Sequence, residues 1–166
     1  MSNRPSFSKY GKSFQEDLVH LILDDRPFAD QILEVLDSNF LELEYLRLFT
    51  SKIVDYRERY GKHPSRQILD TILQTELEKE DKALSQQITE YFGRIRISEV
   101  DGSEYIKEQS LEFCRKQNLK EAMLKSVDLL QSNSFDEISK IINESLKLGS
   151  ESNFGHDFLV DFVQFC

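Results

Sequence analysis

Apolar residues recur along most of this chain at intervals of three and four, the pattern of amphipathic helices. No stretch shows the strict alternation that indicates a strand. Between Ser13 and Ile97 the spacing predicts five helices. The first begins at Ser13, the second at Pro27 and the fourth after Ser65. The third spans about Glu42–Tyr60, and the fifth spans about Asp81–Ile97. The pattern therefore predicts an all-α fold that opens with a compact bundle of about five helices.

Local signals place several of the helix ends. Ser13 with Glu16 forms a capping-box pattern, and Ser65 is a second candidate N-cap. Pro27 suits a first-turn position, since its missing amide hydrogen is not needed there. Gly61 is a natural residue to end a helix. The second helix is expected to end near residues 37–39.

The inward faces of these helices predict the core of the bundle. They consist of large apolar or aromatic side chains at helical spacing, namely Phe14, Leu18, Leu21, Ile22, Phe28, Ile32, Val35, Leu36, Leu46, Phe49, Ile53, Tyr56, Tyr60, Ile68, Leu69, Ile72, Leu73, Leu84, Ile88, Tyr91, Phe92 and Ile95.

A change of pattern follows at "SEVDGSE". Beyond it the spacing predicts a helix over Ser103–Gln131, long beside the mean of about 11–12 residues, then a short "SNS" turn and a last helix over Phe135–Leu148. Two helices joined by so tight a turn form an antiparallel hairpin. The expected organisation is a flexible N-terminus over 1–12, a globular helical subdomain over 13–98, the hairpin over 103–148 and a linker over 149–166.

The hairpin carries more apolar residues than its two arms can bury on each other. The surplus is expected to form an oligomer interface from Leu111, Met123, Val127, Leu130, Ile138, Ile142 and Leu146. A second apolar group follows the linker "GSESNFG" and comprises Phe158, Leu159, Phe162 and Phe165. These four residues are expected to dock on another domain.

Composition and charge restrict the function. The net charge is −9 with a pI near 4.9, so the chain by itself is expected to bind DNA or RNA weakly, because such binding depends on neutralising phosphates. No apolar run is long enough for a bilayer, and the N-terminus lacks a secretory signal. Cys114 and Cys166 form no motif, and a reduced cytoplasmic setting is expected.

Common catalytic motifs are absent from the sequence. It contains no G-x-x-x-x-G-K-[ST] loop, no H-E-x-x-H and no C-x-x-C. His20 lies four residues before Asp24, and the favoured interpretation is a contact on one helix face. A helical metal hydrolase using His20, Asp24 and Asp25 is an alternative that lacks a second ligand cluster. No catalytic, cofactor-binding or metal-binding residue is therefore predicted.

Several stretches together resemble the N-terminal domain of DnaB-type replicative helicases. "SFQEDLVHLILDDRPFADQIL" is followed by "FLELEYLRLFTSKIVDYRERYGKHPSRQIL", which supplies the family's aromatic, "YG" and proline positions in order, except that Tyr45 stands where bacterial members commonly have histidine. "EYIKEQSLEFCRKQNLKEAMLKSVDLLQ" and "SFDEISKIINESLKLG" look like the two arms of the family's hairpin. "FGHDFLVDFVQF" is similar to the linker before the motor in the T-even-type phage branch.

The resemblance implies a non-catalytic oligomerisation and docking domain. Hairpins of this family pair, giving a dimer or a trimer of dimers within a hexamer, and the domain recruits primase and a helicase loader. ATP, Mg and DNA would be bound by a RecA-like motor domain beyond Cys166, so the full-length protein would be an ATP-dependent helicase. The alternative, from the residues alone, is a stand-alone helical interaction adaptor.

Overall fold

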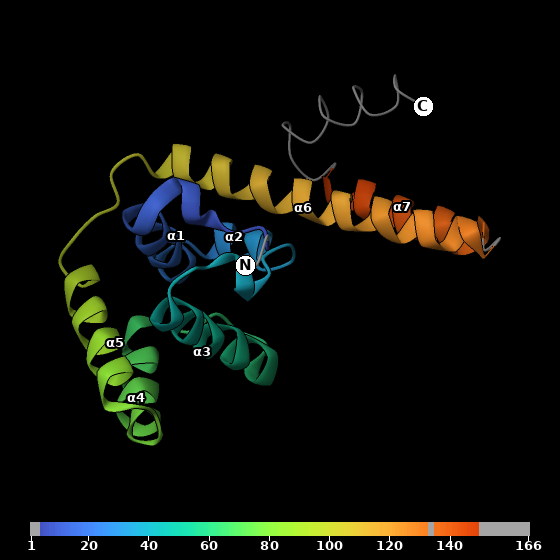
Figure 1. The fold of residues 1–166 in the computed structure, drawn as a ribbon. Coiled ribbons are helices and arrows are strands. Elements are labelled where there is room, and N and C mark those ends of the chain that lie inside the picture. Colours follow the sequence, from blue (N-terminus) through green and yellow to red (C-terminus); the bar gives the residue numbers. More distant parts are fainter. Residues whose placement is uncertain (1–3, 133–134, 150–166) are drawn as a thin grey trace. The chain divides into compact units, whose positions relative to one another are not determined.

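The fold is all-α. The structure, a computed structural model, describes residues 4–132 and 135–149, and every regular element within them is a helix (Figure 1). The all-α expectation is confirmed. The chain divides into two compact units, Met1–Glu108 and Gln109–Cys166, and the boundary falls inside the longest helix.

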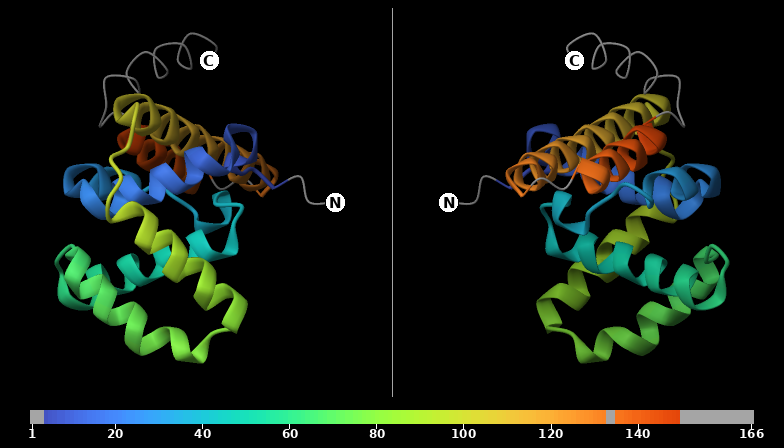
Figure 2. Two further views of the ribbon diagram at one scale, coloured as in Figure 1. Left: turned by 90° about the vertical axis from the view of Figure 1, so that its left-hand side faces the viewer. Right: turned by 90° about the vertical axis from the view of Figure 1, so that its right-hand side faces the viewer.

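Five α-helices and three 3₁₀-helices make up most of unit 1. In chain order they are η1 (Phe7–Tyr10), α1 (Gly11–Asp24), α2 (Arg26–Ile32), η2 (Ser38–Phe40), α3 (Glu44–Tyr60), α4 (Arg66–Glu76), η3 (Leu77–Lys79) and α5 (Lys82–Ile95). Helix α3 is central, because it packs against α1, α4 and α5. Figure 2 shows α3, α4 and α5 crossing one another rather than lying parallel.

The structured part of unit 1 begins earlier than the pattern predicts. Phe7 is fully buried in η1, and α1 starts at Gly11 rather than Ser13. Ser13 lies inside α1, so its predicted capping role is wrong. Residues 1–12 were expected to form a flexible segment. The structure differs from this expectation at Phe7, whose ring packs against the rings of Phe14 and Phe40, with centroids 5.9 and 6.3 Å apart.

Helix α2 is shorter than predicted. It ends at Ile32, and the chain then turns, with the Val35 amide donating to the Ile32 carbonyl at 3.0 Å. Pro27 lies in the first turn as expected, and Asp25 is the N-cap, accepting from the Phe28 amide at 3.1 Å. The apolar periodicity continues past Ile32 because Val35 is also buried, but Val35 lies in the turn and not in the helix.

The predicted C-terminal end of α3 and the predicted N-cap of α4 are confirmed. Gly61 ends α3 in the left-handed conformation with φ 67°, which an L side chain rarely adopts. Ser65 caps α4, and its Oγ accepts from the Ile68 amide at 3.1 Å. The turn between them is therefore fixed at both ends by local chemistry.

The core of unit 1 contains most of the predicted inward residues, and its centre is aromatic. The Phe49 ring contacts the rings of Tyr91 and Phe92 edge-on, with centroids 5.2 and 5.8 Å apart. Tyr60 and Ile68 were predicted to be buried, and this is wrong, because they are 56% and 38% exposed. Both residues continue the apolar spacing of their helices, which is why burial was predicted. In the described part of the chain no other element covers them fully.

Polar contacts tie α5 to α1. Tyr91 Oη donates to the carbonyl oxygen of Glu16 at 2.5 Å, and the Glu16 carboxylate forms an ion pair with Arg94. Burial, with the negative charge of Glu16, raises the pKa of Tyr45 to about 12 and that of Tyr91 well above its ordinary value. Both phenols therefore stay neutral in the folded protein near neutral pH.

Unit 2 consists of the greater part of α6 (Ser103–Gln131) and of α7 (Phe135–Gly149), as the apolar pattern predicts to within one residue. The two helices run side by side in opposite directions (Figures 1 and 2). The first residues of α6 belong to unit 1, where Lys107 Nζ lies 2.5 Å from Asp25 Oδ2.

Candidate functional site

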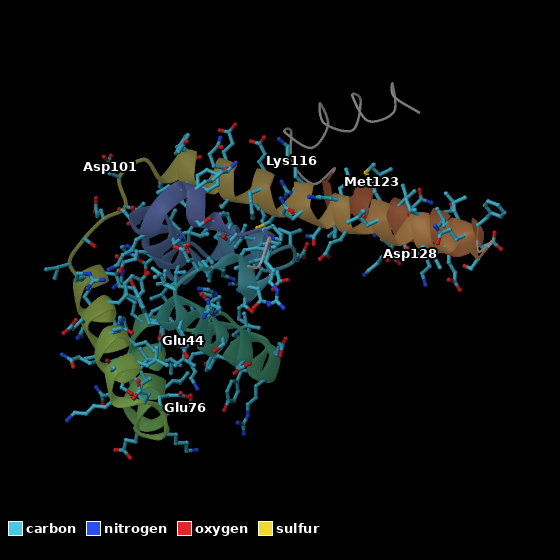
Figure 3. All side chains as sticks on the ribbon, in the orientation of Figure 1. Glu44, Glu76, Asp101, Lys116, Met123 and Asp128 are labelled. Atoms are coloured by element: carbon cyan, nitrogen blue, oxygen red, sulfur yellow. The ribbon has the colours of Figure 1, made fainter. Side chains whose placement is uncertain are left out.

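The candidate site is an exposed apolar surface on α6. Met123, Leu124, Val127 and Leu130 are 43%, 60%, 52% and 50% exposed, and together they are called the α6 stripe here. Their spacing of one, three and three residues places them along one side of the helix. Figure 3 shows Met123 and Asp128 projecting on different sides of α6. The stripe is therefore an apolar surface on a helix whose other exposed positions are largely polar.

The buried face of α6 lies next to this stripe. Beyond residue 115, the buried positions are Leu119, Ala122 and Ser126, which follow one another at intervals of three and four. Two of the three are small, and Ser126 Oγ donates to the Ala122 carbonyl at 2.8 Å, so its hydroxyl is satisfied within the helix. A face of small side chains buries little apolar area, which leaves the larger residues of this segment on the stripe.

Helix α7 contributes a second, half-covered apolar face. Ile138, Ile142 and Leu146 all retain intermediate exposure, and no residue described in 135–148 is fully buried. The apolar face of a helix in a globular protein is normally buried against the core. Both arms of the hairpin therefore carry apolar area beyond what they cover on each other.

The seven predicted interface residues divide into three groups. Met123, Val127 and Leu130 lie on the exposed stripe, and the three α7 residues are half-buried. Leu111 is only 9% exposed, which separates it from the stripe. Sequence reasoning missed Leu124, the most exposed member of the stripe, although its position next to Met123 was a usable signal. The predicted linker anchors Phe158, Leu159, Phe162 and Phe165 lie outside the described residues.

A shallow groove continues the stripe toward the middle of α6. It has a volume of about 370 Å³ and is lined by Lys116, Leu119, Lys120, Met123 and Leu124. Lys116 pairs with Glu112 at 2.6 Å, one turn earlier on the helix. The apolar floor and the ammonium groups at its edge make this surface suited to an amphipathic helix with acidic flanks.

His20, Asp24 and Arg66 form a polar cluster at the end of α1. His20 Nε2 lies 2.9 Å from Asp24 Oδ2, which confirms the predicted contact, and Arg66 pairs with Asp24 across to α4. Asp25 does not join this cluster, because it caps α2 and pairs with Lys107. Within 4–132 and 135–149, no three His, Cys, Asp or Glu side chains form a group that could hold a metal ion.

A larger groove lies between α4 and α5. Its volume is about 670 Å³, with Leu73, Leu77 and Phe92 among its lining residues and Glu78, Glu80 and Arg96 among its charged ones. The three apolar residues are nearly buried and belong to the core. The groove is thus a feature of unit 1 alone.

No family model, no curated protein and no solved structure matches this chain. The helices of the described part of the chain include none with the length and apolarity that a bilayer crossing requires.

Proposed function

We propose that this chain is a non-catalytic oligomerisation and docking domain of a hexameric DnaB-type replicative helicase. In this proposal the hairpin of α6 and α7 pairs with the hairpin of a second copy. The proposal is supported by the ordered motifs that resemble the family, from "SFQE" to "FGHDFLVDF". It is also supported by the all-α architecture, in which a long helix, α6, is followed by α7.

The observation that carries the proposal is the α6 stripe. Exposed apolar side chains that occur singly are normal on a protein surface, whereas a contiguous group marks a contact with a partner. Fully burying one Leu or Val side chain contributes about 1.5–3 kcal/mol relative to full exposure. The stripe residues are roughly half exposed, so each has about half of that contribution still to gain from a partner.

A second copy of the hairpin is the occupant with the best chemical match. Paired hairpins would place the stripe of one copy against apolar residues of the other, in the manner of a four-helix bundle. The half-buried residues Ile138, Ile142 and Leu146 would complete the same core. Association still carries an entropic cost, so a dimer held by this surface alone is expected to depend on protein concentration.

The remaining roles in the proposal belong to other domains and partners. Primase and a helicase loader would dock on the assembled domain, while ATP, Mg and DNA would be bound by a motor domain beyond Cys166. Phe158, Leu159, Phe162 and Phe165 would anchor the linker to that motor. The net charge of −9 favours protein partners over nucleic acid for this chain.

Light scattering over a concentration series tests the pairing. A mass that rises toward that of a dimer supports the proposal, and a monomer at high concentration contradicts it. A stand-alone interaction adaptor would expose an apolar surface for the same physical reason. The coding sequence downstream of Cys166 separates the two functions, because only the helicase continues into a G-x-x-x-x-G-K-[ST] loop.

A further inference from the structure

A small pocket in unit 1 has a charge opposite to that of the chain. It lies where the start of α2 meets the turn after α3 and has a volume of about 130 Å³. Its lining consists of Arg26, Asp30, Arg57, Gly61, Lys62 and His63. This pocket belongs to neither the hairpin nor the groove between α4 and α5.

The lining is strongly cationic. Arg26, Arg57 and Lys62 supply three positive charges and Asp30 one negative charge, which leaves a net +2 with His63 neutral. The whole chain carries −9. A concave site that concentrates positive charge on an acidic protein attracts anions, since a low-dielectric wall strengthens the local field.

The centre of the pocket is held in place before any ligand arrives. Arg57 Nη2 donates to Asp30 Oδ1 at 2.5 Å, and Arg57 Nη1 donates to His63 Nδ1 at 2.8 Å. His63 Nε2 in turn donates to the Leu23 carbonyl at 2.7 Å. The contact with His63 holds the guanidinium at the turn, and it would remain in place if an anion displaced Asp30 from Arg57.

The other two cations are exposed and lie at the rim. Arg26 and Lys62 form no ion pair with any residue in 4–132 or 135–149. Gly61 has φ 67°, and this left-handed turn directs the chain back toward α2, so that Lys62 reaches the pocket. Neither side chain is held in an ion pair within these ranges, although the charge of Arg26 acts on Asp30, so both are available to a ligand.

Asp30 occupies the position that an external anion would take against Arg57. The hydrogen bond from Arg57 lowers the pKa of Asp30, and the positive charges of Arg57 and Arg26 act in the same direction. The carboxylate is half exposed, so it can turn toward solvent. An acceptor with more charge than one carboxylate would compete with it for the guanidinium.

We propose that this pocket binds one phosphate group, held by Arg57 at the centre and by Arg26 and Lys62 at the rim. Arginine presents a planar fork of donors that matches phosphate oxygens, and lysine adds a point charge. The volume of about 130 Å³ admits a phosphate group, and every cation of the lining can act on a phosphate, whereas the lining offers no Phe, Tyr or Trp ring on which a base could stack. The ligand class is therefore inorganic phosphate or the phosphate of a small phosphomonoester.

Calorimetric titration of the whole chain at fixed ionic strength tests this site. Inorganic phosphate should bind saturably at concentrations on the order of 10 mM or below. Lys62→Gln and Arg26→Gln should each weaken binding about fivefold, since one charge at about 4 Å contributes about 1 kcal/mol in water. Asp30→Asn should strengthen binding by a similar factor, because it removes the competing carboxylate. A merely structural pocket would not gain affinity in this way.

Arg59→Gln is the matched control, since Arg59 lies in the last turn of the same helix but does not line the pocket. Equal weakening by Arg59→Gln would overturn the proposal, because it would show general charge screening. The absence of saturable phosphate binding would overturn it as well.

A nucleoside monophosphate should bind about as tightly as phosphate, and binding of the nucleotide without binding of phosphate would contradict a phosphate site. Circular dichroism of each variant checks that the fold is retained. The hairpin takes no part, so this outcome is independent of the proposed pairing.

Discussion

His63 Nε2 donates a hydrogen bond of 2.7 Å to the carbonyl oxygen of Leu23, which lies forty positions earlier in the chain. The acceptor is a carbonyl, so Nε2 must carry the proton, while Nδ1 accepts from Arg57. His63 is therefore held as the neutral tautomer with its proton on Nε2. This one side chain connects the end of α1 to the turn between α3 and α4.

Replacing His63 with alanine should destabilise unit 1. The Leu23 carbonyl loses its donor and Arg57 loses an acceptor, and leaving a partly buried polar group unsatisfied costs about 1–3 kcal/mol. Urea denaturation measures the change in the free energy of unfolding. Lys62→Ala, at the neighbouring exposed position, is the control and should stay within about 0.5 kcal/mol of the unmodified protein. Equal stabilities of the two variants would contradict the role given to His63.

Acid should weaken the contact between the N-cap of α2 and the start of α6. Burial opposes ionisation of Asp25, but hydrogen bonds from Lys107 and the Phe28 amide outweigh it, so the pKa of Asp25 lies below its ordinary 3.8. A lowered folded pKa means that the stabilisation is present above 3.8 and is lost as the pH falls through the folded value.

Asp25→Asn tests this pH dependence, because asparagine still caps a helix but cannot ionise. The variant should lose less stability than the unmodified protein when urea unfolding is compared at neutral pH and below 3.8. Asp55→Asn, at an exposed position on α3, should lose as much as the unmodified protein. An identical acid response in all three proteins would refute the expected contribution of Asp25.

Alkaline titration should show that Tyr45 and Tyr91 ionise late. The pKa of Tyr45 is raised to about 12 and that of Tyr91 lies well above 10, chiefly because of burial. Their folded pKa values exceed the unfolded ones, so their contribution to stability is complete below pH 10 and declines as the pH rises through the folded values. Tyrosinate absorbance should show a late phase that coincides with unfolding. Tyr91→Phe should shrink this phase, and a late phase of unchanged size in Tyr91→Phe would be inconsistent with the fold.

Two glycines should respond to alanine in opposite ways. Gly61→Ala forces an alanine into φ 67° and should destabilise the protein by about 1 kcal/mol. Gly93 lies inside α5, and a methyl group at this position would meet no atom within 4 Å, so Gly93→Ala should stabilise by about 0.5–1 kcal/mol. Thermal unfolding of both variants measures the pair, and a shift of the same sign in both would contradict the assigned conformations.

Elements with long, regular periodicity could be predicted from the sequence. Helix α6 starts and ends where the apolar spacing and its flanking turns place it, and Gly61 and Ser65 fix the turn before α4 by local chemistry. The start of α1 could not be predicted in the same way. Phe7 packs on Phe40, which is distant in sequence, so this contact cannot be read from the local pattern. The helix begins at Gly11, and the capping pattern at Ser13 does not set its start.

The candidate sites were predictable to different degrees. The surplus of apolar residues on the hairpin follows from counting them, so Met123, Val127 and Leu130 were found, but which of them face outward depends on how α7 lies. The basic pocket was not found, because Arg26 and Lys62 are separated by the whole of α3. Their proximity arises only when α2 and the turn after α3 meet in the folded chain.

The central claim is that the α6 stripe pairs with a second copy, and Val127→Asp tests it most directly. Val127 is 52% exposed, so the substitution should leave circular dichroism and the melting temperature of the monomer nearly unchanged. Ile97→Asp is the matched control, since Ile97 is 91% exposed and lies outside the hairpin. Light scattering across one concentration series should show the unmodified protein and Ile97→Asp associating alike, and Val127→Asp remaining monomeric, because pairing would bury an unpaired carboxylate. Association of Val127→Asp at the same concentrations as Ile97→Asp would contradict the claim.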